Sequence, residues 1–411
     1  MAVQSLVRQP EPADDTPEVF ISRQPVLDRE MRVTGYRVAY AAADGTPGAE
    51  RSASRLFGDV LSVVGLQELV GESLAHLPIS RELLLTLGIP PVRPDRVMLR
   101  LSYDVAADPE LREILDGLAD RGYALALSEI PDLDFDTGLL DLFGTVEVDF
   151  TRVSPLGAAR ALKKILAGHA APMAVGLHDH ASYEEAKGLG FHLFSGAFFV
   201  SPRNSEVRNV PIAGMGSLIS LVRLQGSSAE IEELERVIDH DVGLSVKLLR
   251  YINSAYFGMR SNISSIRQAV MMLGARGVSR WALMIVLTGS PNTPRELSVM
   301  ALTRARMCEI MGMSRTDIAG DELFTVGLLS VADALLDRPL ESIIGELPLT
   351  EDITAALVHR TGPAGAILDA VIAYELANFE QESVQAHRAA VMAMAYMDAL
   401  SWAQETVAGA A

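Results

Sequence analysis

Short apolar runs alternate with amphipathic stretches between residues 18 and 202, and this alternation restricts the fold more than any other feature of the sequence. Runs typical of β-strands lie at 34–40, 96–101, 123–127, 145–148 and 173–177, with helix-like stretches such as 109–121 and 182–189 between them. Alternation of strands and helices predicts an α/β domain with a largely parallel sheet. Because about seven or eight such units follow one another, a (β/α) barrel is the natural closure.

The remainder of the chain has a helical pattern. The stretches 231–238, 243–253 and 265–273 carry apolar residues at helical spacing. An N-terminal segment rich in Pro, Asp and Glu is typical of disorder, and a polar segment bracketed by prolines is typical of a linker. The sequence therefore predicts a disordered tail at 1–17, an α/β barrel at 18–202, a linker at 203–211 and an all-α domain at 212–405.

The composition bears on the compartment. Hydrophobic residues make up 49% of the 411 residues, which is enough for substantial cores. The single cysteine, Cys308, excludes an intrachain disulfide and fits a reducing compartment. It lies on an apolar helical face, so we expect it to be packed and not nucleophilic. The N-terminus lacks the apolar core of a signal peptide, and no run is long enough to span a bilayer. We therefore expect a cytoplasmic protein without a membrane partner.

The charge is unevenly distributed along the chain. The net charge is -18, which argues against binding to nucleic acid. Between 242 and 295, however, there are seven basic residues and no acidic one. These cations either pair with acidic segments of the protein itself or form a surface for an acidic partner.

Several motifs carry a resemblance to known families. FISRQPVLDREMRVTGYRVAY, GYALALSEI, VEVDF and GFHLFSGAFFVSP resemble the EAL cyclic di-GMP phosphodiesterase domain. Residues 231–287, with LLRYINSAYFG and SSIRQAVMMLGARGVSRWAL, resemble HDOD, a relative of the HD phosphohydrolases. Together these resemblances cover about residues 18–400, and the order of the two domains makes them specific. They imply a bacterial signalling protein in which a degenerate TIM-like (β/α) barrel of EAL type precedes an all-helical HDOD domain.

The EAL resemblance implies carboxylates at the strand ends that hold two divalent cations, which clamp a phosphodiester and activate water. Here its signature Glu falls on Arg37, its Asn on Pro78 and its next Glu on Arg100. The remaining positions of the vestigial site are Ser128 and Glu129 for an Asp pair, Glu147 for a Lys, Asp149, and His178 for a Glu. Cations at ligand positions repel a metal, so we expect no catalytic residue, no metal and no cofactor.

The histidines do not restore a metal site. The HD phosphohydrolases need a His together with a His-Asp pair, but the helical domain has only His240, His359 and His387. The dipeptide His240-Asp241 has no second His nearby in the sequence. The triplet at 178–180, His-Asp-His, is expected to be a solvated loop after a barrel strand, because adjacent loop residues rarely aim at one point.

A polar interruption in the helical domain has two interpretations. Asn253 and Ser254 interrupt an apolar helix just before an aromatic pair and Gly258. Asn253 either caps the helix by bonding local backbone or belongs to a partner-binding edge, where Tyr and Arg are favoured. The candidate partner-binding residues are Lys247, Arg250, Tyr251, Asn253, Ser254, Tyr256, Arg260 and Arg267.

The sequence thus predicts a non-catalytic signal-transduction scaffold or adaptor that acts through protein–protein contacts with unidentified signalling proteins, alone or as a homo-oligomer. The alternative is a sensor that binds cyclic di-GMP or another anionic nucleotide without hydrolysis, through Arg37 and Arg100. A third hypothesis is residual phosphodiesterase activity. Buried cations need partners, so we expect Arg37 or Arg100 within about 4 Å of Glu129, Glu147 or Asp149.

Overall fold

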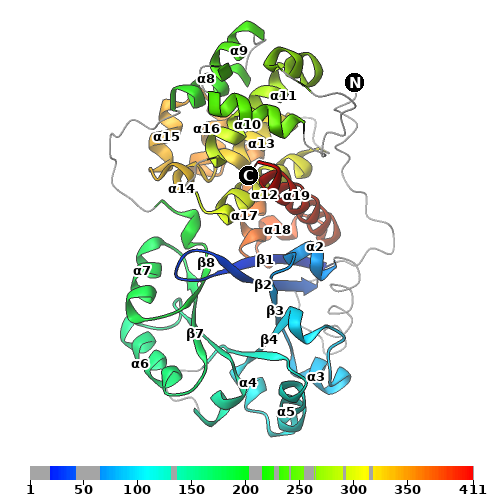
Figure 1. Cartoon of the computed structure of the whole chain (residues 1–411), viewed down its shortest axis with the longest axis vertical. Helices are drawn as coiled ribbons and strands as arrows, with labels where there is room; N and C mark the ends of the chain where they lie inside the picture. Colours follow the sequence, from blue (N-terminus) through cyan, green and yellow to red (C-terminus); the bar gives the residue numbers. More distant parts are fainter. Residues whose placement is uncertain are drawn as a thin grey trace. The chain divides into compact units, whose positions relative to one another are not determined.

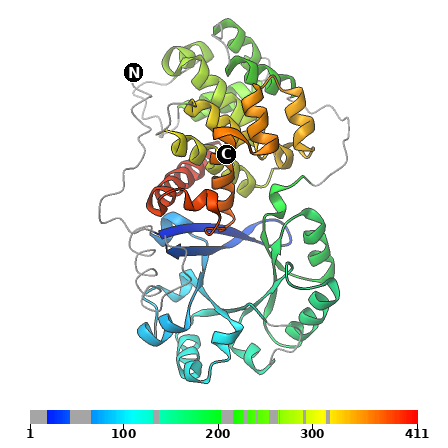
Figure 2. The ribbon, with the colours of Figure 1, turned by 180° about the vertical axis from the view of Figure 1, so that it is seen from behind.

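The computed structural model describes residues 19–42, 65–130, 137–202, 215–225, 231–239, 242–253, 263, 265–289, 293–313 and 318–410. The chain forms two compact units (Figures 1 and 2). The barrel unit consists of the described residues of Pro12–Ser201 together with Ala373–Ala393. The helical unit consists of those of Pro202–Ile372 and Met394–Ala411. The predicted tail at 1–17 and linker at 203–211 lie outside the described residues.

Eight strands close into a barrel, which confirms the predicted fold (Figure 1). In chain order they are β1 (Val19–Leu27), β2 (Val33–Ala42), β3 (Leu74–Pro78), β4 (Val97–Ser102), β5 (Ala124–Ser128), β6 (Thr145–Asp149), β7 (Ala171–Leu177) and β8 (Leu193–Gly196). Neighbouring strands from β2 to β8 are parallel, whereas β1 is antiparallel to both β2 and β8. A tight turn explains this exception. Asp28 Oδ1 accepts hydrogen bonds from the N–H groups of Glu30 and Arg32, so the chain reverses at once.

Helices surround the strands of the barrel (Figures 1 and 2). They are α2 (Leu66–Val70), α3 (Arg81–Leu87), α4 (Tyr103–Ala106), α5 (Arg112–Asp120), α6 (Pro155–Leu166) and α7 (His180–Leu189). Short 3-10 turns lie at Pro94–Arg96, Pro109–Leu111, Thr137–Leu142 and Phe198–Val200. Side-chain caps start several of the helices: Ser80 accepts from Leu83 N–H, and Ser154 accepts from Gly157 N–H.

Strand β4 shows how the pleat sorts its side chains. Val97, Leu99 and Leu101 are fully buried on one face, and Arg100 lies on the other. Such alternation lets apolar side chains pack under the helices while polar ones face the interior and mouth of the barrel. The pleat therefore positions the candidate site described below.

The helical unit contains a long series of helices. They are α8 (Met215–Gln225), α9 (Ile231–Asp239), α10 (Val242–Ile252), α11 (Ile266–Thr288), α12 (Arg295–Gly312), α13 (Gly320–Leu329), α14 (Ala332–Leu336), α15 (Leu340–Glu346), α16 (Glu351–His359), α17 (Gly362–Glu375) and α19 (Ala389–Ala410). Helices α17 and α19 also contribute residues to the barrel unit, and α18 (Glu382–Gln385) belongs entirely to the barrel unit. Helix α12 is buried along nearly its whole length, and Cys308 on it is fully buried, as expected.

Helix α11 has the length and apolar composition of a membrane-spanning helix, but half of its most apolar window is buried within the protein. It is also interrupted at Gly274, whose φ of 77° leaves the helical region. Helices α8, α9 and α10 pack against it. A buried helix packed on several sides is equally typical of a protein core.

The barrel unit includes a segment from the C-terminal part of the chain. The hydroxyl of Tyr374 accepts a hydrogen bond from Ile21 N–H at 3.0 Å, and Gln24 Nε2 donates to Leu376 O at 3.2 Å. The ring of Phe379 stacks on Phe20 with centroids 5.4 Å apart. Among the described residues, β1 pairs with β8 only at Leu27. The segment around Tyr374 therefore covers the part of that edge of β1 that precedes Leu27. The sequence analysis had assigned it to the helical domain.

Candidate functional site

The centre of the candidate site is a carboxylate held between two guanidiniums. Arg100 Nε lies 2.7 Å from Glu147 Oε1, and Arg100 Nη2 lies 3.1 Å from Oε2. Arg37 Nη2 lies 3.2 Å from the same Oε2. Glu147 is 2% exposed, and the side chains of Arg37 and Arg100 are 18% and 14% exposed. The expected contact between a mouth arginine and an acid is therefore confirmed for both arginines.

Strand register brings these three side chains together. Pro78 on β3 is the partner of Arg100 on β4, and Arg100 is in turn the partner of Ala126 on β5. Ala126 pairs with Thr145 on β6, and Glu147 lies two residues further along, on the same side of that strand. The small side chain of Ala126 leaves room for Arg100 to reach across β5. All these groups project near the carboxyl ends of parallel strands, where barrel sites are built.

The electrostatics of the cluster follow from burial and charge. Burial opposes ionisation of Glu147, but the charges of Arg100 and Arg37 outweigh it and lower its pKa to about 2. Burial also lowers the pKa of Arg37, and the charge of Glu147 opposes that shift. Arginine stays protonated at physiological pH. The cluster consequently holds two positive charges and one negative charge.

His76 belongs to the same cluster, and the sequence analysis missed it. It lies on β3 opposite Arg37 and is 2% exposed. Burial lowers the pKa of His76 to about 4. The positive charges of Arg100 and Arg37 act in the same direction, and the negative charge of Glu147 opposes them. The imidazole is therefore neutral at pH 7, and its Nδ1 has no hydrogen-bond partner among the described residues. The signal was present in the sequence, because His76 stands two residues before Pro78 and so shares its side of the strand.

The backbone at the end of β3 takes part as well. Tyr40 donates a hydrogen bond from its hydroxyl to Pro78 O at 2.9 Å. Burial raises the pKa of Tyr40, so the hydroxyl remains protonated and can donate. Pro78 itself offers no side-chain ligand. The mouth is thus bordered by Tyr40, His76 and the two arginines.

The other predicted positions do not join the ion pairs. Ser128 is buried and donates its hydroxyl to Leu101 O at 3.0 Å. Glu129 is exposed and has a left-handed φ of 51°. His178 is exposed at the end of β7. Asp149 accepts hydrogen bonds from Thr151 N–H and Oγ1 at 2.9 and 2.7 Å, although its charge still acts on Arg37.

A glycine fixes the place of the Asp149 carboxylate. Gly176 on β7 has a φ of 72°, and a Cβ built there would lie 2.5 Å from Asp149 Oδ1. Any larger residue would be strained and would displace the carboxylate. Asp149 is therefore turned towards Thr151, and Arg152 lies 3.6 Å away on its other oxygen.

The residues at the mouth do not fit the pair of divalent cations that the EAL resemblance implies. Two of the expected ligand positions hold guanidiniums, and both of these already bind the buried carboxylate of Glu147. Within the described part of the chain, no group of three or more His, Cys, Asp and Glu side chains is placed to hold a metal. In the triplet at 178–180, Asp179 caps α7 by accepting from Ser182 N–H, and the His180 ring packs against Tyr183.

The candidate partner-binding residues have mixed roles. Asn253 Nδ2 donates to Leu249 O and Ile263 O, and its Oδ1 accepts from Ile263 N–H, so this side chain holds the backbone. Lys247 donates to Gly289 O at 2.8 Å. Arg250 is exposed and makes no ion pair with another described residue. Three of the candidates lie outside the described residues: Ser254, Tyr256 and Arg260. The same holds for the side chain of Tyr251.

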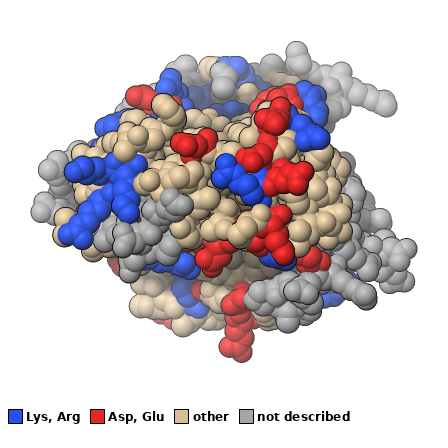
Figure 3. Space-filling model, turned by 90° about the horizontal axis from the view of Figure 1, so that it is seen from below, with Lys and Arg blue, Asp and Glu red and all other residues tan. Residues whose placement is uncertain are grey.

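Some cations of the basic stretch pair with the protein's own acids. Arg267 lies 2.6 Å from Glu235 and 3.6 Å from Glu232. Arg280 binds Glu309 through both of its Nη atoms, at 2.6 and 2.7 Å. Figure 3 shows another face of the protein, seen from below in the view of Figure 1, and this face also carries both blue basic and red acidic side chains. Internal pairing thus accounts for part of the basic stretch, and Arg250 remains available to a partner.

The chain is similar to a known domain family and to several known proteins. Residues 217–335 match the HDOD domain family. The chain is 26% identical over 388 residues to the cyclic di-GMP phosphodiesterase CdgJ of Vibrio cholerae. The alignment covers 91% of this chain and 89% of CdgJ. It is 23% identical over 376 residues to the uncharacterised protein YuxH of Bacillus subtilis, covering 88% and 92%.

A solved structure of BlrP1 from Klebsiella pneumoniae, in complex with calcium and cyclic di-GMP, is also similar, with 15% identity and a TM-score of 0.37. That match covers 45% of this chain and 56% of the BlrP1 chain. At this level of similarity it carries no inference about the site.

The closed barrel and the helical region after it define a two-domain protein with an EAL-like N-terminal barrel. Its helical region contains an HDOD domain, over residues 217–335. This confirms the family relationship expected from the motifs.

Proposed function

We propose that the chain is a non-catalytic signal-transduction protein that acts through protein–protein contacts of its HDOD domain. The supporting observation is the placement of Arg37 and Arg100, both bound to Glu147, where the EAL resemblance implies metal ligands. We further propose a cytoplasmic location and unidentified signalling proteins as partners.

The physical reason lies in charge. Phosphodiester hydrolysis of the EAL type needs cations that activate water and stabilise the developing charge. A guanidinium at a ligand position repels such a cation, and the repulsion is stronger in a partly buried site than in water. The carboxylate of Glu147 is already neutralised by two arginines and has little attraction left for a metal. The mouth is therefore stable without an ion.

The similarity to the phosphodiesterase CdgJ argues for hydrolysis, so hydrolysis has to be tested directly. The full chain is incubated with cyclic di-GMP and either Mg²⁺ or Mn²⁺, and linear product is separated by chromatography. We expect no product above a protein-free control. Turnover that disappears with a chelator and in the Asp149→Asn variant would refute the proposal.

A second candidate function is that of a sensor for cyclic di-GMP or another anionic nucleotide. The observation that favours it is the excess of positive charge at the mouth, where two guanidiniums share one carboxylate, and Arg37 Nε has no partner among the described residues. Phosphate oxygens are strong acceptors for arginine. Calorimetric titration with cyclic di-GMP separates the candidates. Binding without turnover, weakened in Arg100→Gln, would favour the sensor, and no heat of binding would favour the scaffold.

A further inference from the structure

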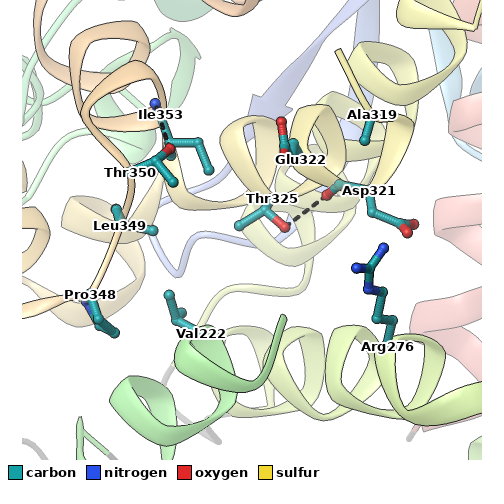
Figure 4. A pocket seen from close by; sticks show the side chains of 10 residues that line it. All are labelled: Val222, Arg276, Ala319, Asp321, Glu322, Thr325, Pro348, Leu349, Thr350 and Ile353. Carbon is teal, nitrogen blue, oxygen red and sulfur yellow. Dashed lines mark hydrogen bonds between the residues drawn. The ribbon is translucent and has the colours of Figure 1, made fainter. Parts of the chain in front are cut away.

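The helical unit contains a pocket of about 160 Å³ between α8, α11, α13 and the segment leading into α16 (Figure 4). Pro348, Leu349 and Ile353 lie on one side of it, and Arg276 and Asp321 lie on the opposite side. Every lining residue belongs to the helical unit. The pocket is therefore a property of that unit alone.

The interior of the pocket is suited to an apolar group. Its hydroxyls are engaged, since Thr325 donates to Asp321 O at 2.9 Å and Thr350 accepts from Ile353 N–H as the cap of α16. Val222, Leu349 and Ile353 supply hydrocarbon surface. A cavity of about 150 Å³ accommodates a benzene ring, so this space matches one branched or aromatic side chain and is too small for a nucleotide.

Among the described residues that line the pocket, Arg276 is the basic one, and it lies with the acidic residues Asp321 and Glu322. The side chain of Arg276 is exposed and makes no hydrogen bond or ion pair with another described residue. Asp321 lies on the same side of the pocket as Arg276 and is 3.4 Å from Arg280, which partly neutralises that carboxylate. Arginine binds carboxylates in bidentate fashion and is favoured at interface hot spots. A ligand with an apolar side chain next to a carboxylate would fill the pocket with the side chain and pair its carboxylate with Arg276.

We propose that this pocket docks a segment of a partner protein that inserts one apolar side chain and presents an adjacent carboxylate to Arg276. The inference rests on the proposed function, because it gives the HDOD domain a defined contact for its partner. The anchor fills the space between Val222, Leu349 and Ile353. The carboxylate is the C-terminal carboxylate of that segment, and it binds Arg276.

Three small probes test the chemistry on the full chain by ligand-observed NMR titration. N-acetyl-leucine carries the anchor and a carboxylate, N-acetyl-leucinamide is neutral, and leucinamide is a cation. We expect affinity to fall about tenfold from the first to the second, because one charged hydrogen-bonded contact is lost, and further for the third. No binding of N-acetyl-leucine, or strongest binding of leucinamide, would overturn the proposal.

Variants locate the binding on the pocket. Arg276→Gln should lower the affinity for N-acetyl-leucine about tenfold and leave that for N-acetyl-leucinamide unchanged. The matched control is Arg295→Gln, an exposed arginine outside the pocket lining that makes no ion pair with another described residue, and it should change neither affinity. Ala319→Leu adds volume from an exposed wall residue and should block all probes without opening the core. Equal effects of the two arginine variants would refute the site. Hydrolysis of cyclic di-GMP would refute the proposed function instead and leave these results intact.

Discussion

The hydroxyl of Tyr374 accepts a hydrogen bond from the N–H of Ile21, across 353 residues of sequence. Phe379 stacks on Phe20 beside this contact, with both rings almost fully buried. The first strand of the barrel is therefore completed by a segment near the far end of the chain. This has direct consequences for stability and for dissection of the protein.

Phe379→Ala should destabilise the barrel unit by about 3 kcal/mol, because it removes a buried aromatic ring from β1. Urea denaturation of the full chain measures the change. Leu376→Ala is the control, since Leu376 is 39% exposed and should cost less than about 1 kcal/mol. Equal effects of the two variants would show that the stack contributes nothing specific.

Limited proteolysis should cut first at 203–211, the segment whose composition predicts a linker. The two fragments should nevertheless stay together on native size-exclusion chromatography, because Ala373–Ala393 belongs to the barrel unit. They should separate in denaturant. Fragments that part without denaturant, or first cuts within 243–287, would contradict this expectation.

Glu147→Gln should destabilise the protein by about 3 to 5 kcal/mol, because it leaves two partly buried guanidiniums without a counter-charge. Thermal and urea unfolding measure the loss. Glu110→Gln is the matched control: Glu110 also pairs with an arginine, Arg81, but is 71% exposed, so its loss should cost under about 1 kcal/mol. A Glu147→Gln variant as stable as the control would show that the buried cluster is not needed.

His76 should make stability depend on pH in a defined window. Its pKa is lowered to about 4 in the folded protein, whereas an unfolded histidine titrates near 6.5. The unfolded chain therefore takes up the proton first, and stability should fall as the pH drops from about 6.5 to about 4. His76→Gln should flatten this part of the profile, and His192→Gln, at an exposed position, should leave it unchanged. A profile that is identical in His76→Gln would rule out this role.

The sequence predicted those features that depend on local pattern. The predicted strands at 123–127 and 145–148 appear as Ala124–Ser128 and Thr145–Asp149, because a short apolar run that forms a buried strand is visible within a few residues. The pairing of Arg37 and Arg100 with Glu147 was also predictable, because strand ends converge at one mouth and a buried cation needs a partner.

Other features had no local signal. The contact between Ile21 and Tyr374 depends on how distant segments pack, and the helical pattern around Tyr374 gave no sign of a role in the barrel. His76 is not one of the motif positions of the EAL resemblance, although it shares one side of β3 with Pro78, which is. The antiparallel direction of β1 depends on the turn at Asp28, and strand patterns do not carry direction.

The carboxylate shared by Arg37 and Arg100 also limits how this mouth can change over evolutionary time. Replacing either arginine by an acid would place two carboxylates side by side in a nearly dry site before any metal could bind them. Replacing Glu147 first would strand both arginines. Every single substitution towards a metal-binding mouth therefore passes through a less stable protein, so the present arrangement opposes the stepwise appearance of a pair of metal sites at these positions.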